Sequence, residues 1–143
     1  VEFKKANIKM ASQNASNIVF RKDYTAPDHQ IESIDLSFDL IPTCTEVTSK
    51  IIAVPQEDRK SDDLILDGDD LTLVSILPGQ YDMRPGKLII HNIKERTEIE
   101  IVTRINPRNN LELSGLYMSK NNYITQCESE GFRRITYLPD RPD

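Results

Sequence analysis

The sequence of 143 residues lacks the features that mark several classes of protein. Its longest strictly apolar run, 51–54, is far too short to cross a bilayer, so we expect no membrane span. Lys and Arg total 18 against 23 Asp and Glu, and the two signs alternate along the chain, which argues against a nucleic-acid groove. Only two cysteines, Cys44 and Cys127, are present. They are too few for a disulfide framework, so we expect both to be buried or half-buried thiols.

The N-terminal stretch shows no charged segment followed by an apolar one and a small-residue cleavage site, the pattern of a secretory signal. We therefore expect a cytoplasmic protein, in which the sequon at 14–16 is not glycosylated. The first residue is Val rather than Met. We expect 1–21 to be a flexible N-terminal segment, with 1–9 a leader before a true start at Met10, and 22–143 to form one domain.

The composition favours strands over helices. Seventeen Ile, six Val and nine Thr stand against five Ala, and branching at Cβ suits a pleated surface better than a helix. Apolar and polar residues alternate along Ser33–Leu40 and again along Thr97–Ile105. Each of these two segments is therefore predicted to be a strand with one buried face and one exposed face.

Further short strands are expected between these two, separated by turns rich in Pro, Gly and Asp. Their spacing of roughly ten residues is typical of an all-β fold, which we expect to be an antiparallel β-sheet or β-sandwich. No segment has the periodicity of a helix of useful length. The additional predicted strands are Thr45–Val54, Leu64–Leu66, Leu71–Leu77 and Lys87–Ile93.

The residues that usually carry chemistry are scarce. The two histidines, His29 and His91, belong to no metal-ligand pattern; we expect His91 to be structural and His29 to be solvated. The acidic stretch 67–70 lacks the spacing and the closing Glu of a calcium loop, so it is interpreted as a plain turn. With no nucleophile pair and no HExxH motif, a complete active site in these residues is improbable.

The C-terminal third is unusual, because polar and charged residues crowd a stretch where the centre of a β domain is expected. Ser114–Tyr117, Thr125–Tyr137 and Asp140–Asp143 resemble the amino-terminal domain of the aminopeptidase N family, a family of zinc-dependent metallopeptidases, in its bacterial form. The opening stretch Asp23–Asp28, followed by the strand at Asp35–Leu40, resembles the first strands of the same family in the same order.

The resemblance implies a β-sandwich or saddle that leans on a thermolysin-like catalytic domain. In this family the catalytic domain carries the zinc ligands, from HExxH and a distant Glu, so the resemblance implies zinc in the full-length enzyme and none bound by this fragment. We expect the sequence at hand to end before the family's first domain is complete. The fragment alone is predicted to be inactive.

Carried over residue by residue, Glu128 matches the carboxylate that binds the free α-ammonium group of a peptide substrate, and Gln126 matches the neighbouring amide. Structural roles are expected for Glu130, Arg133 and Arg134, while Gly131 allows a turn and Phe132 fills the core. The 140–143 motif is interpreted as scaffold, with an Arg–Asp pair and a stiffening Pro. Cys127 is expected to point away from its two neighbours, into the core.

A second interpretation is a stand-alone β-sandwich that binds a peptide or protein partner without catalysis. Under either interpretation the partners are peptides or proteins, not nucleic acid or membrane. An incomplete sandwich would leave a strand edge and an apolar face uncovered, so we also predict self-association of the isolated chain.

Overall fold

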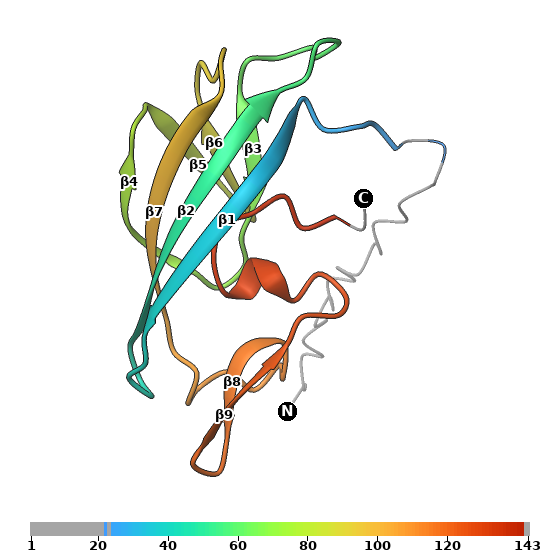
Figure 1. Ribbon diagram of the computed structural model, residues 1–143. Helices are drawn as coiled ribbons and strands as arrows, with labels where there is room; N and C mark the ends of the chain where they lie inside the picture. Colours follow the sequence, from blue (N-terminus) through green and yellow to red (C-terminus); the bar gives the residue numbers. More distant parts are fainter. Residues whose placement is uncertain (1–21, 23, 142–143) are drawn as a thin grey trace, which may run out of the picture.

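The computed structural model describes residue 22 and residues 24–141. The expected flexible segment 1–21, with the leader 1–9 and the sequon 14–16, lies outside the described residues, as do 142 and 143 of the C-terminal motif. The described residues contain no helix long and apolar enough to span a membrane. They form two β-sheets, a β-hairpin and a single turn of 3-10 helix (Figure 1).

The larger sheet has four antiparallel strands in the order β1-β2-β7-β4. The Val-, Ile- and Thr-rich segments form long strands, and in β7 every second residue is buried, as the alternation predicts. β1 lies at the edge of the sheet, which leaves the Phe38 side chain of its apolar face 38% exposed. The strands are β1 (His29–Asp39), β2 (Thr45–Pro55), β4 (Thr72–Leu77) and β7 (Thr97–Ile105).

The smaller sheet has three antiparallel strands in the order β3-β6-β5. They are β3 (Leu64–Asp67), β5 (Tyr81–Arg84) and β6 (Lys87–Ile90). β6 is three residues shorter than predicted, because the chain turns at Asn92, whose φ of 62° is incompatible with a strand. β5 was not predicted; all four of its residues are exposed, so it lacks the alternation that marks a half-buried strand.

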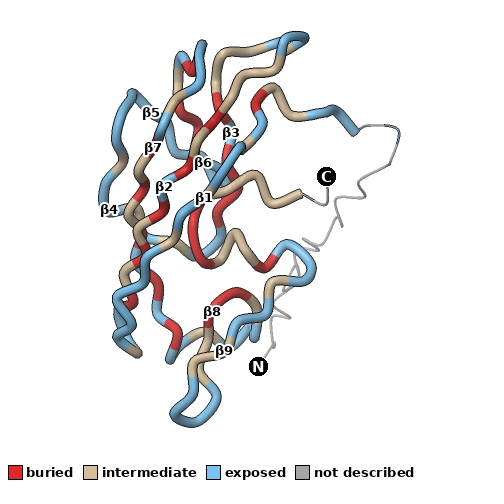
Figure 2. Tube along the Cα trace, in the orientation of Figure 1, coloured by how far each residue is buried: buried red, intermediate tan, exposed pale blue. Residues whose placement is uncertain are grey.

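The two sheets face each other across the main hydrophobic core, so the fold is an all-β sandwich, as the sequence predicts (Figure 2). Strands of both sheets contribute to this core. It consists of Ile51, Ala53, Leu64, Leu66, Leu88, Ile90, Ile93, Ile99, Ile101 and Tyr137.

A β-hairpin extends from one end of the sandwich (Figure 1). Its strands, β8 (Gly115–Ser119) and β9 (Asn122–Gln126), pair only with each other among the described residues, and the 3-10 helix η2 (Phe132–Arg134) follows. A second apolar cluster joins this end to the larger sheet. Its buried members are Val47, Ile105, Leu116 and Ile135.

Three expectations about individual side chains are wrong. His29 is 3% exposed, not solvated, and its Nε2 lies 2.8 Å from the carbonyl oxygen of Ile93, which satisfies the buried ring. Cys44 is exposed, because it lies in the turn between β1 and β2. Phe132 is only half-buried on η2, and the neighbouring Ile135 and Tyr137 enter the core instead.

Candidate functional site

The two predicted substrate-binding residues lie together in the turn between β9 and η2. Gln126 is the last residue of β9, and Glu128 follows two positions later; both are exposed. The Gln126 side-chain Nε2 donates a hydrogen bond of 3.0 Å to the backbone carbonyl of Glu128. The backbone N–H of Gly131 donates across the same turn to the carbonyl of Cys127, at 2.9 Å. The turn is therefore closed by its own hydrogen bonds while it presents Glu128 to solvent.

Cys127 separates the two residues and faces the other way, as expected. It is half-buried against the apolar cluster around Val47 and Ile135. Burial, assisted by the negative charge of Asp140, raises the pKa of the Cys127 thiol above its usual value. The neutral, partly buried thiol packs the turn against the core, and the side chains of Gln126 and Glu128 on either side of it stay exposed.

Gly131 does permit the turn, but through its missing side chain and not through its backbone angles. The residue with positive φ is Glu130, at 64°, whereas Gly131 has an ordinary φ of −80°. A Cβ on Gly131 would stand 2.5 Å from the carbonyl oxygen of Gln126 and 2.8 Å from the Cα of Cys127. The sequence pattern gave no signal for this close approach, because the contact is set by the fold.

The charged residues beside the turn are paired with each other, which supports the structural roles expected for them. Glu130 pairs with Arg133 at 3.3 Å, and Arg134 pairs with Asp69 at 2.6 Å. The Nε of Arg133 also donates to Asp140 Oδ2 at 3.0 Å. Burial alone would lower the pKa of Arg133, but the hydrogen bond to Asp140 and nearby carboxylates raise it, so the guanidinium stays charged.

Two residues of the C-terminal motif, Asp140 and Arg141, contact other parts of the domain. Asp140 binds Arg133 on η2, and Arg141 reaches back to the opening segment, where its Nη2 donates to the carbonyl of Thr25 at 3.0 Å. The first contact holds η2 to the segment that follows it, and the second joins segments 116 positions apart, so both residues act as scaffold, as predicted. The contribution of Pro142 and Asp143 lies outside the described residues.

The acidic turn 67–70 and His91 also have protein partners. Asp67 pairs with Lys87 and accepts a hydrogen bond from the backbone N–H of Asp140, while Asp69 is neutralised by Arg134. His91 lies between the carboxylates of Asp63, which directly precedes β3, and Asp82 of β5. These pairings explain the acidic turn and His91 as structural features.

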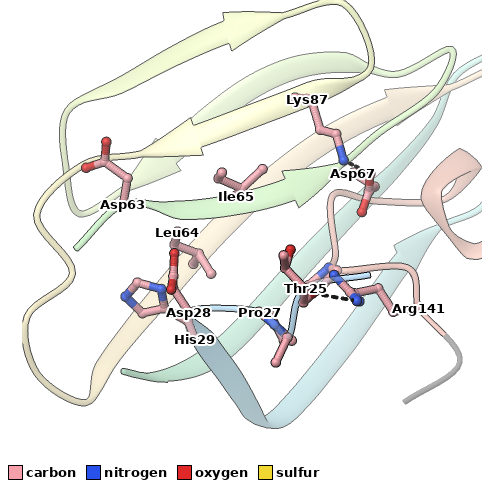
Figure 3. Close-up of a pocket in the computed structure, with 12 residues that line it drawn as sticks. Thr25, Pro27, Asp28, His29, Asp63, Leu64, Ile65, Asp67, Lys87 and Arg141 are labelled. Carbon is pink, nitrogen blue, oxygen red and sulfur yellow. Dashed lines mark hydrogen bonds and ion pairs between the residues drawn. The ribbon is translucent and has the colours of Figure 1, made fainter. Parts of the chain in front are cut away.

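A cleft of about 290 Å³ opens between the segment before β1, strand β3 and the C-terminal segment (Figure 3). Charged groups line it, among them Asp28, Asp63, Lys87 and Arg141. Each is engaged by the protein: Asp28 accepts from the backbone N–H of Lys60, Asp63 contacts His91, Lys87 pairs with Asp67, and Arg141 bonds Thr25. The cleft therefore marks where the two ends of the domain are joined.

The described residues do not fit a zinc ion. Within 22 and 24–141, no group of three or more His, Cys, Asp or Glu side chains is placed to hold a metal. What the turn can do chemically is accept hydrogen bonds from a cation, through the exposed Glu128 carboxylate and the amide oxygen of Gln126.

No family model matches the sequence, but individual proteins do. The chain is 44% identical to aminopeptidase N of Escherichia coli (strain K12) over 129 residues, and 40% identical to aminopeptidase N of Caulobacter vibrioides over 128 residues. These matches cover 87% and 85% of this chain and 15% of each relative. A crystal structure of Legionella pneumophila aminopeptidase A in complex with aspartic acid matches the fold with a TM-score of 0.76 and 36% identity, over 85% of this chain and 15% of that one.

The chain is an all-β domain whose fold matches part of an aminopeptidase structure. Its sequence is similar to one segment of aminopeptidase N from three bacteria. The chain spans about 15% of the length of the curated relatives it matches.

Proposed function

We propose that this chain is part of a zinc-dependent, cytoplasmic aminopeptidase and supplies the residues that bind the free α-ammonium group of a peptide. Glu128 is the charged acceptor and the side-chain oxygen of Gln126 is the second. The observation that carries the proposal is the hydrogen bond from Gln126 Nε2 to the Glu128 carbonyl. One of the two amide N–H groups of Gln126 is used inside the turn, which holds the amide there, and its oxygen is available as an acceptor, which an ammonium group needs.

The exposure of Glu128 agrees with this role. Its carboxylate has no ion pair among the described residues, whereas the neighbouring Glu130 has Arg133. A hydrogen bond between a carboxylate and an ammonium contributes about 1.5–3 kcal/mol when the site is partly shielded from water. The relative from Legionella pneumophila was crystallised with aspartic acid, a free amino acid that carries such an ammonium group.

Binding the amino end fixes the register of the substrate. If the α-ammonium is held at one place, only the first peptide bond reaches the reacting centre, so removal of single N-terminal residues follows from geometry. Glu128 does not transfer a proton in this scheme. We propose that hydrolysis and zinc binding belong to a thermolysin-like domain elsewhere in the protein.

The decisive test compares two carboxylates of the same turn in the full-length enzyme. Glu128→Gln should lower kcat/KM for an aminoacyl anilide by about ten- to a hundredfold, the equivalent of one charge-assisted hydrogen bond. Glu130→Gln is the matched control, and it should leave kcat/KM within about twofold because its partner Arg133 keeps Asp140. Equal effects of the two substitutions would reject the assignment.

The length of the relatives favours a peptidase over a stand-alone binding module. The coding sequence beyond Asp143 separates the two functions directly. An HExxH motif and a later Glu in the same frame would support the peptidase, whereas a stop codon would support the module.

A further inference from the structure

We propose that Gly131 is a positioning residue for the turn between β9 and η2. Because Gly131 has no side chain, the turn can close in the conformation that places the Glu128 carboxylate. This inference rests on the proposed function, because it concerns how the same turn is shaped to bind an ammonium group.

The structure shows that residue 131 lies against the backbone of the strand end that leads to Glu128. A Cβ at this position would meet the carbonyl oxygen of Gln126 at 2.5 Å, the Cα of Cys127 at 2.8 Å and the Oγ of Ser114 at 2.9 Å. Two of these three contacts are with backbone atoms, which cannot swing aside as a flexible side chain can. Any larger residue must therefore push the 126–127 backbone away from η2.

The other side of this contact is equally restricted. Gly115, the first residue of β8, has a φ of 75°, and a Cβ on it would stand 2.7 Å from the Cβ of Arg134 and 3.2 Å from the carbonyl oxygen of Gly131. The turn is thus fixed between the start of β8 and the end of β9. The turn therefore has little freedom to relax if Gly131 is replaced by a larger residue.

Displacement of the 126–127 backbone reaches Glu128 along two routes. Glu128 is bonded covalently to Cys127, and its carbonyl accepts the hydrogen bond from the Gln126 side chain. The Gly131 N–H to Cys127 bond, 2.9 Å long, would be strained by the same movement. A shift at residue 131 is therefore transmitted to both acceptors of the proposed ammonium site.

The backbone angles make the substitution Gly131→Ala a clean probe of this contact. With φ at −80° and ψ at −21°, residue 131 lies in the helical region that alanine adopts readily. Alanine adds only the steric contact and no backbone strain. Gly79→Ala is a suitable control: Gly79 has a φ of 127° in the β4–β5 turn, so its replacement strains the fold far from Glu128.

The experiment measures recognition of the amine separately from general activity, in the full-length enzyme. Inhibition constants are determined for leucinol and for its analogue without the amino group. The constant of the analogue divided by that of leucinol gives a ratio that reports the amine's contribution to binding. Gly131→Ala should reduce this ratio about tenfold or more, since misplacement by about 1 Å can cost up to 10²-fold. The inhibition constant of the des-amino analogue should stay within about twofold.

The variants distinguish failure of this inference from failure of the proposed function. If Glu128→Gln leaves the ratio unchanged, Glu128 does not bind the amine and the proposed function is wrong. If Glu128→Gln lowers the ratio but Gly131→Ala does not, or if Gly79→Ala lowers it as much as Gly131→Ala, only the positioning role is rejected. Should Gly131→Ala not fold, the double variant with Ser114→Ala, which removes one of the three contacts, replaces it with the same expected reduction.

Discussion

The guanidinium of Arg141 lies over the ring of Tyr24, with its Cζ 4.6 Å from the ring centroid. The same side chain donates to the carbonyl of Thr25, 116 positions earlier in the sequence. The first and last described segments of the domain are thus joined by a cation–π contact and a hydrogen bond. The two ends of the domain are therefore held together by side-chain contacts.

Removal of this link should destabilise the domain modestly. Arg141→Ala is expected to lower the free energy of unfolding by about 1–2 kcal/mol, the sum of an exposed cation–π contact and one hydrogen bond. Arg141→Lys should lose less, because it keeps the charge over the ring. Urea denaturation of the three proteins measures this, and equal stability of wild type and Arg141→Ala would show that the contact contributes nothing.

The centre of the sandwich should be far more sensitive. Ile51 and Ile99 are directly paired across β2 and β7, and both are fully buried. Ile99→Ala should cost about 2–5 kcal/mol and Ile99→Val about 0.5–1.5 kcal/mol, through lost transfer energy and the cavity left behind. Val74→Ala, at a 41% exposed position of β4, is the control and should change stability little. A small cost for Ile99→Ala would mean that the two sheets do not pack as described.

The long strands could be predicted from the sequence because their alternation records burial directly. β2 and β7 lie in the middle of the sheet and differ from their predicted bounds by one residue at most. β8 and β9 were missed because the hairpin packs on a small cluster, so burial does not alternate clearly along either strand. Tertiary contacts, which a local pattern does not contain, define this hairpin.

In the candidate site, too, some features could be predicted from the sequence and others depend on tertiary contacts. Glu128 and Gln126 were assigned by resemblance, and the structure adds that they share one hydrogen-bonded turn. The burial of His29 was not foreseen, because its partner, the carbonyl of Ile93, lies 64 positions away. No rule based on neighbouring residues identifies such a partner.

Gly68 is a second position where a missing side chain shapes the fold. A Cβ there would overlap the ring of Tyr137, which is 4% exposed in the main core. Gly68→Ala should therefore destabilise the domain by about 1–3 kcal/mol through overpacking. Combining it with Tyr137→Leu should cost less than the sum of the two single changes, because the clash is removed with the ring. Additive costs in thermal or urea unfolding would disprove the contact.

His91 should make stability depend on pH in the neutral range. Its Nδ1 lies 3.2 Å from Asp63 Oδ1 and its Nε2 3.3 Å from Asp82 Oδ2, and only the protonated ring can donate to both carboxylates. The hydrogen bond to Asp63 raises the pKa of His91, burial opposes the rise, and the bond to Asp82 adds to it.

Because the folded pKa of His91 lies above the unfolded value, the folded state binds the proton more tightly. The stabilisation is therefore fully present below the unfolded pKa of about 6.5 and is lost as the pH rises through the folded pKa. The stability difference between wild type and His91→Gln should accordingly be larger below pH ~6 than above pH ~8. Asp82→Asn should lower the pKa of His91 in an NMR titration, where the only other histidine signal is that of the buried His29. A difference between wild type and His91→Gln that does not vary with pH would show that the ring is not held by its charge.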